Sequence, residues 1–215
     1  MDTKTFLKIL DIISQNIQDN TPSSILKNSF NRTPYTILIA TLLSLRTKDE
    51  NTARVVKELF LIANTPQSML QIPIEQLQEI VKPTGMYRKK AQILHDVSQT
   101  LIDKFNSKVP NTQKELLSIK YIGEKTANIV LNNAFNIPII AVDTHVHRIP
   151  NLLGFINTKN EKNTQRELSK KIPKKYWSII NFNIVSFGQT ICKPRNPNCN
   201  ICPISIFCRK NSFTN

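Results

Sequence analysis

Apolar residues recur along the chain at helical spacing and rarely alternate as they would in a strand. One stripe after Arg88 keeps an i, i+3/i+4 rhythm, at Ala91, Leu94, Val97, Leu101 and Phe105. A second stripe precedes Gly188, which we expect to end its helix, and comprises Trp177, Ile180, Ile184 and Phe187. The one β-like run, Ile137–Val142, is interrupted by Pro138. The pattern predicts an all-α fold.

Polar residues mark where several of these helices begin. A threonine followed three residues later by a glutamate is typical of a capping box, and it occurs at Thr47–Glu50, Thr112–Glu115 and Thr164–Glu167. Thr65 before Pro66 predicts a further helix start. The longest apolar region, Tyr35–Leu45, predicts a buried helix.

The net charge of the chain indicates which class of molecule it binds. The chain of 215 residues has 29 Lys and Arg against 15 Asp and Glu, a formal net charge of +14. Such an excess attracts polyanions and favours nucleic acid as the partner, although a general bias toward lysine would give the same composition. No apolar stretch approaches the roughly 18 residues of a membrane span. The first residues lack the layout of a signal peptide, so we expect an intracellular protein of the cytoplasm or nucleoid.

All four cysteines fall near the end of the chain, in the pattern C-x6-C-x2-C-x5-C: Cys192, Cys199, Cys202 and Cys208. In a reducing compartment such a group indicates a metal centre rather than disulfides. One C-x2-C pair suits either an iron–sulfur cluster or zinc, although all-cysteine zinc sites usually show two such pairs. Spacing alone leaves both metals open.

A second group of chemically suggestive residues lies between Leu116 and Phe155. Residues 112–119 and Glu124–Phe135 are predicted to be helices, joined by a tight break at Lys120–Gly123. A helix, short glycine turn and helix can offer backbone N–H groups to a phosphate, but such packing is common in all-α proteins.

Lys125 lies in the first turn of the second of these helices, where the helix dipole disfavours a cation. A lowered pKa there would yield a neutral amine able to attack carbon. Asp143 follows the apolar run, where its carboxylate can be partly buried. A solvated lysine and an aspartate that caps the next helix are the plain structural alternatives.

Taken together, GEKTANIVLNNAF, AVDTHVHR and the cysteine pattern resemble the endonuclease III branch of the helix–hairpin–helix DNA glycosylases. The resemblance extends upstream through LLSLRTKDENT and TGMYRKKA and covers about residues 33 to 208. It implies a [4Fe–4S] cluster on the four cysteines, with Lys125 as the Schiff-base lysine and Asp143 as the catalytic aspartate. It also implies action on double-stranded DNA containing damaged bases or abasic sites. A monomer is the default expectation for the oligomeric state.

The implied activity is that of a bifunctional glycosylase and AP lyase, which removes oxidised pyrimidines and cuts the strand by β-elimination. The implied architecture is a six-helix barrel of residues 27–137 with the helix–hairpin–helix, and a cluster domain of residues 1–26 and 138–215, with the active-site cleft between the two lobes. Alternatives are a monofunctional or mismatch-directed (uracil or thymine) glycosylase of the same fold, and a non-catalytic iron–sulfur protein that binds DNA.

The resemblance also indicates residues that contact DNA. Arg46 occupies a wedge position where the family commonly has glutamine, and Met86 one where an apolar wedge is usual, although Met86 would equally suit a core. Lys193 and Arg195 between the first two cysteines would reach phosphates, or would be ordinary solvated charges.

The hairpin would contribute further contacts from Lys120, Tyr121, Ile122 and Gly123. Here the sequence departs from the family's L-P-G-V-G, because Tyr121 replaces the first glycine, and a positive φ there costs on the order of 1 kcal/mol or more. We therefore expect either a different hairpin shape or a compensating contact from Tyr121. A direct phosphate contact from Lys120 would offset weaker donation by the backbone.

Overall fold

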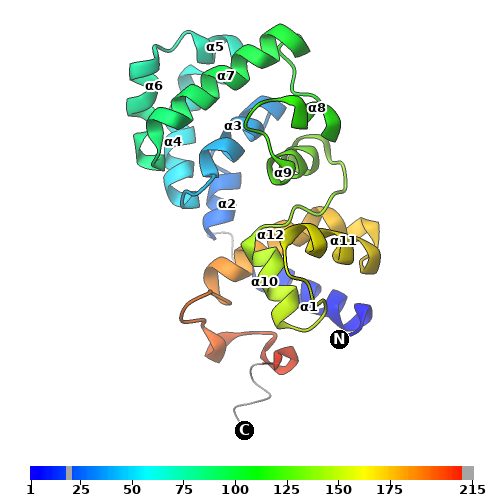
Figure 1. The fold of residues 1–215 in the computed structure, drawn as a ribbon. Coiled ribbons are helices and arrows are strands. Elements are labelled where there is room, and N and C mark those ends of the chain that lie inside the picture. The colour runs from blue at the N-terminus through cyan, green and yellow to red at the C-terminus, as the bar shows by residue number, and fades with distance from the viewer. Residues whose placement is uncertain (18–20, 210–215) are drawn as a thin grey trace. The chain divides into compact units, whose positions relative to one another are not determined.

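The computed structural model describes residues 1–17 and 21–209, and in these ranges α-helices and short 3-10 helices occur without any strand (Figure 1). The predicted all-α fold is confirmed, and the run Ile137–Val142 is an irregular connection rather than a strand. Among the described helices, none combines the length and the apolar character needed to cross a membrane.

The chain forms two compact units, Met1–Ser23 with Pro138–Asn215, and Ser24–Ile137. Helices of the discontinuous unit are α1 (Thr3–Asn16), α10 (Thr144–Leu152), α11 (Glu161–Lys171), η2 (Lys174–Tyr176), α12 (Trp177–Thr190), η3 (Cys199–Ile201) and η4 (Ser205–Phe207). Starting with α2 (Pro22–Lys27), which crosses the boundary, the continuous unit contains α3 (Pro34–Ser44), α4 (Asp49–Ile62), α5 (Pro66–Leu70), α6 (Ile74–Val81), η1 (Lys82–Thr84), α7 (Tyr87–Phe105), α8 (Gln113–Ser118) and α9 (Glu124–Phe135). The assignment of a six-helix barrel to residues 27–137 stays a prediction.

Helix α3 forms the centre of the continuous unit. Every residue from Tyr35 to Leu43 is buried, and the helix packs against α4, α7 and α9 (Figure 1). A helix that is apolar all round is stable only when neighbours cover it on all sides. Its one phenol, on Tyr35, is bonded to the Ser98 hydroxyl at 2.7 Å, and burial raises the pKa of Tyr35 while this bond lowers it.

The discontinuous unit has its own core, built where α1, α10 and α12 pack together. Phe6 of α1 stacks on Phe155 with ring centroids 4.0 Å apart. Cys192, Cys202 and Cys208 pack against the edge of this core. The cysteine segment is therefore attached to a formed hydrophobic core.

Three sequence-based expectations about helix ends are wrong. Thr47 caps no helix, since α4 begins at Asp49 after Lys48, and Thr164 lies inside α11, whose cap is Asn160. Gly188 lies within α12, which continues to Thr190. Glycine fits at this position because the His145 ring occupies the space that a side chain would need. The helix starts after Thr65 and Thr112 are confirmed.

Candidate catalytic and metal sites

Lys125 is the second residue of α9 and is exposed, whereas the three residues that follow it are buried. The helix begins after Gly123, which has no side chain to cap the first N–H groups. The first turn of a helix carries partial positive charge, and anions bind there. The amine of Lys125 is thus accessible from solvent at a position that also attracts a phosphate group.

Asp143 is the N-cap of α10. Its Oδ1 accepts hydrogen bonds from the backbone N–H groups of His145 at 3.0 Å and Val146 at 2.9 Å. Both of these bonds use Oδ1. The capping role therefore holds a half-buried carboxylate at the start of α10.

The hairpin between α8 and α9 is a tight turn in which the Ile122 N–H donates to the Ile119 carbonyl at 3.1 Å. Tyr121 holds φ of 73°, at the third position of the turn, where a type II turn requires a positive φ and usually has glycine. The side chain of Ile122 is buried and its N–H is engaged in the turn. Gly123 is exposed. The contact of Ile122 with DNA stays a prediction.

Tyr121 makes a contact that offsets this backbone strain. Its phenol donates to Oδ2 of Asp96 on α7 at 2.9 Å, and the Lys120 ammonium lies 4.7 Å from the centre of its ring. The neighbouring Tyr121 raises the pKa of Lys120, with a smaller contribution from Asp96. Lys120 is exposed and keeps its positive charge beside the turn.

The two expected wedge residues occupy loop positions with left-handed backbone. Arg46, between α3 and α4, has φ of 56°, and Met86, between η1 and α7, has φ of 47°. Arg46 is exposed and Met86 keeps 49% of its surface accessible. A place in the core is thereby excluded for Met86, and both side chains are available to a partner.

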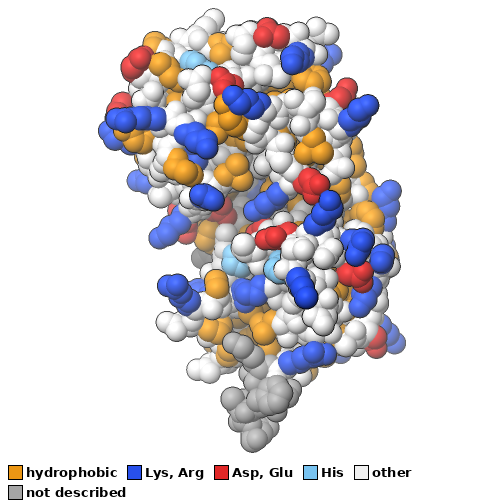
Figure 2. All heavy atoms as spheres, in the orientation of Figure 1, with side chains coloured by type: hydrophobic (Ala, Val, Ile, Leu, Met, Phe, Trp, Pro, Cys, Tyr) orange, Lys and Arg blue, Asp and Glu red, His pale blue; other side chains and the backbone are white. Residues whose placement is uncertain are grey.

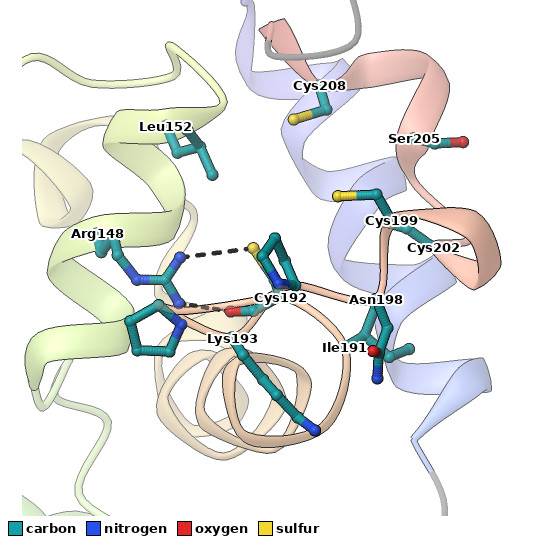
Figure 3. Close-up of a pocket in the computed structure, with 12 residues that line it drawn as sticks. Arg148, Leu152, Ile191, Cys192, Lys193, Asn198, Cys199, Cys202, Ser205 and Cys208 are labelled. Atoms are coloured by element: carbon teal, nitrogen blue, oxygen red, sulfur yellow. Dashed lines mark hydrogen bonds between the residues drawn. The ribbon is translucent and has the colours of Figure 1, made fainter.

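The four cysteines line one pocket, together with Arg148 of α10 (Figure 3). Arg148 donates to Sγ of Cys192 at 3.6 Å and to its carbonyl oxygen at 2.5 Å. Burial raises the pKa of Cys202, and the other three thiols add to this effect, with a backbone N–H opposing it. If the four thiols lost their protons, the site would need a compensating cation, of which Arg148 would supply only part.

Lys193 and Arg195 are exposed, and Lys193 also lines the pocket edge. Figure 2 shows further Lys and Arg side chains on the face it presents. Sequence reasoning missed Arg148, although it stands within AVDTHVHR, because nothing in the spacing relates it to a cysteine 44 residues away.

These features define a helix–hairpin–helix protein of DNA repair, and residues 39–174 match the family described as HhH-GPD superfamily base excision DNA repair protein. Within that superfamily the chain belongs to the endonuclease III family. It is 44% identical to endonuclease III of Thermotoga maritima, over 81% of this chain and 82% of that relative. The endonuclease III of Escherichia coli K12 is 32% identical over 94% of both chains.

Two solved structures resemble the whole chain. One, a non-covalent endonuclease III–DNA complex, has a TM-score of 0.88 and 34% identity, and covers 99% of this chain and 97% of that one. The other, a trapped endonuclease III–DNA covalent intermediate, has a TM-score of 0.86 and 33% identity, with 99% and 98% covered. A thermostable thymine-DNA glycosylase at 23% identity shares the fold.

Proposed function

We propose that this chain is a bifunctional DNA glycosylase and AP lyase of base excision repair that acts on oxidised pyrimidines in duplex DNA. The observation that carries the proposal is the exposed Lys125 at the start of α9, in a chain whose relatives are endonuclease III enzymes. A relative of this family has been trapped as a covalent intermediate with DNA. A primary amine accessible from solvent is the group that such a covalent step requires.

The chemistry follows from the two side chains. With the damaged nucleotide extruded from the duplex, Nζ of Lys125 attacks C1′, and the bond from C1′ to the base breaks. Asp143 takes up the proton from the lysine ammonium or stabilises the positive charge on the sugar, and Oδ2 is the oxygen that the two cap bonds do not use. The C1′–O4′ bond then breaks, O4′ takes up a proton, and an imine forms between C1′ and Nζ. The imine acidifies C2′, and loss of a C2′ proton expels the 3′ phosphate.

We further propose that Cys192, Cys199, Cys202 and Cys208 hold one [4Fe–4S] cluster. Zinc would need four sulfurs at about 2.3 Å from one ion, whereas a cluster takes each thiolate on a separate iron. Four thiols line one pocket, as a cluster with one thiolate on each iron requires. The similarity of the chain to endonuclease III enzymes supports the choice of the cluster over zinc. When bound, the cluster supplies iron–thiolate bonds that cross-link residues 192–208.

DNA contacts are assigned to three regions: the hairpin residues Lys120, Tyr121 and Gly123, the loop residues Arg46 and Met86, and the cysteine-segment residues Lys193 and Arg195. All but Tyr121 are exposed, and the lysines and arginines suit phosphates. Because the proposed substrate is duplex DNA, we propose that the protein acts inside the cell, in the cytoplasm or at the nucleoid.

Borohydride trapping on duplex DNA with a defined lesion tests the lyase. We expect wild type to give a covalent protein–DNA adduct and a cut strand. Lys125→Arg keeps the charge but lacks a primary amine, so it should give neither product. A monofunctional glycosylase would instead release the base without any adduct. Equal trapping by wild type and Lys125→Arg would assign the nucleophile to another amine and overturn the proposal.

A further inference from the structure

Lys90 of α7 is a buried lysine that has no carboxylate partner within residues 1–17 and 21–209. It keeps only 4% of its surface accessible, and its Nζ donates to the Leu43 carbonyl at 2.7 Å, the Thr47 hydroxyl at 2.5 Å and the Thr84 carbonyl at 2.9 Å. Thr47 in turn donates to the same Thr84 carbonyl at 2.7 Å. An ammonium group has three N–H donors, and all three are used here.

The three acceptors come from different segments of the continuous unit. Leu43 lies in the last turn of α3, where carbonyls lack helical partners and attract a cation. Thr47 lies in the loop that carries Arg46, and Thr84 ends η1 just before Met86. One ammonium group therefore joins the end of α3 to both loops that carry the exposed wedge residues.

Each of the two loops contains a residue in a strained backbone conformation, which the surrounding contacts must hold in place. Arg46 and Met86 are non-glycine residues with positive φ, and a conformation of this kind costs on the order of 1 kcal/mol or more. Such residues keep their conformation when surrounding contacts outweigh the strain. The bonds to Lys90 are made one residue after Arg46 and two residues before Met86, where they oppose relaxation of either loop.

Lys90 itself is not a second nucleophile. Burial lowers the pKa of Lys90 to about 8, which would favour a reactive amine, but the nitrogen is enclosed and committed to three acceptors. Lys125, in contrast, is exposed. Lys90 acts through the loops and touches no reacting atom.

We infer that Lys90 is a positioning residue, which fixes the Arg46 and Met86 loops together so that both side chains enter DNA as one unit when the damaged nucleotide is extruded. This inference rests on the proposed function, because it assigns the two loops to that substrate. Extrusion costs a few kcal/mol, least at sites already unpaired. Loss of the positioning residue should therefore impair excision from paired DNA more than excision from DNA that is already open.

The test compares single-turnover excision of one oxidised pyrimidine from a fully paired duplex and from the same duplex with mismatches flanking the lesion. Lys90→Met removes the three bonds at similar length, and Thr47→Val removes the bridging hydroxyl. Lys89→Met is the matched control, since Lys89 is the exposed neighbour on the same helix. Amide hydrogen exchange of residues 45–48 and 84–87, measured without DNA, reports the loops directly.

We expect Lys90→Met to slow excision from the paired duplex about tenfold and from the open duplex less than about threefold. Thr47→Val should slow the paired reaction about threefold, and both variants should exchange faster in the two loops while Lys89→Met matches wild type. Equal slowing on both duplexes, or folded variants with wild-type rates and exchange, would overturn the inference. If Lys90→Met does not fold, the excision rates and the hydrogen exchange of Thr47→Val decide whether the inference holds. A wild type without activity would refute the proposed function, and the exchange measurements would still decide whether Lys90 holds the loops.

Discussion

The phenol of Tyr121 donates a hydrogen bond of 2.9 Å to Asp96, and so ties the apex of the hairpin to the middle of α7. Tyr121 has φ of 73° and stands where the family's hairpin pattern has glycine, which adopts this conformation freely. The cost of the backbone and the gain from the anchor are of similar size, about 1 kcal/mol each. The tyrosine therefore keeps the turn while adding a link that glycine lacks.

Tyr121→Phe should lower the free energy of unfolding by about 1 kcal/mol, because the strain stays and the hydrogen bond is lost. The free energy of unfolding of Tyr121→Gly should lie between those of Tyr121→Phe and wild type, since glycine loses the hydrogen bond but removes the backbone strain. Denaturant unfolding of the three proteins measures the order. A glycine variant less stable than the phenylalanine variant would contradict this account.

Replacing Asp143 separates its capping role from its chemistry. Asparagine caps helices about as well as aspartate, so Asp143→Asn should change stability by less than about 0.5 kcal/mol, and Asp143→Ala should cost about 1 kcal/mol. Both variants should lose most strand cleavage at the lesion, because neither has a carboxylate. Thermal unfolding and a cleavage assay on the same preparations test this, and an Asn variant with wild-type cleavage would remove Asp143 from the mechanism.

The pKa of Lys90 predicts a dependence of stability on pH. Burial holds this pKa at about 8 in the folded protein, below its ordinary value of 10.5. Between these two values the unfolded chain binds more protons at this position than the folded chain does, so stability rises with pH. The difference in unfolding free energy between wild type and Lys90→Met should shift in favour of wild type from pH 7.5 to pH 10. A pH-independent difference would show that Lys90 titrates normally.

Arg148 should help the cysteine segment to retain the proposed cluster. Arg148→Met removes the donors to the sulfur and carbonyl of Cys192, and we expect a lower iron and sulfide content per chain and faster loss of visible absorbance under chelator. Arg148→Lys, which keeps one charge, should be intermediate. Iron and sulfide analysis also tests the cofactor, because purified wild type that contains zinc and no sulfide would exclude a cluster.

Substitution by alanine should destabilise the protein to different extents at two glycines. A methyl group at Gly188 would collide with the ring of His145, whereas one at Gly123 meets nothing within 4 Å. Gly188→Ala should therefore destabilise the protein by about 1–3 kcal/mol, and Gly123→Ala by a few tenths of a kcal/mol. Thermal unfolding compares them directly. Equal effects would mean that the His145 ring moves aside freely.

Periodicity is enough to predict an all-α fold, because buried stripes such as those of α7 and α12 follow directly from helical geometry. Local motifs are less reliable. Thr47 and Thr164 both satisfy a capping pattern, but their hydroxyls bond to residues far away in sequence, Thr84 and His147. A pattern of four residues contains no information on such distant partners.

The same reason explains which site residues the sequence reveals. The cysteines stand in a short motif with a chemical meaning of its own, whereas Lys125 and Asp143 become candidates only through the resemblance to the endonuclease III family. Lys90 stands between Lys89 and Ala91 on a regular helix, and only its burial and its three acceptors distinguish it from its neighbour. Its role depends on the folded arrangement of α3, η1 and α7.

One unit is assembled from both ends of the chain, and this orders the events of synthesis. The apolar face of α1, with Phe6, Ile9, Leu10 and Ile13, leaves the ribosome before its partner α12, which is made only after the whole continuous unit. Residues 24–137 can fold before α1 has a partner to pack against. Since the cysteine segment follows α12, a nascent chain stalled before residue 177 would lack both α12 and the four cysteines, and the apolar face of α1 would stay exposed.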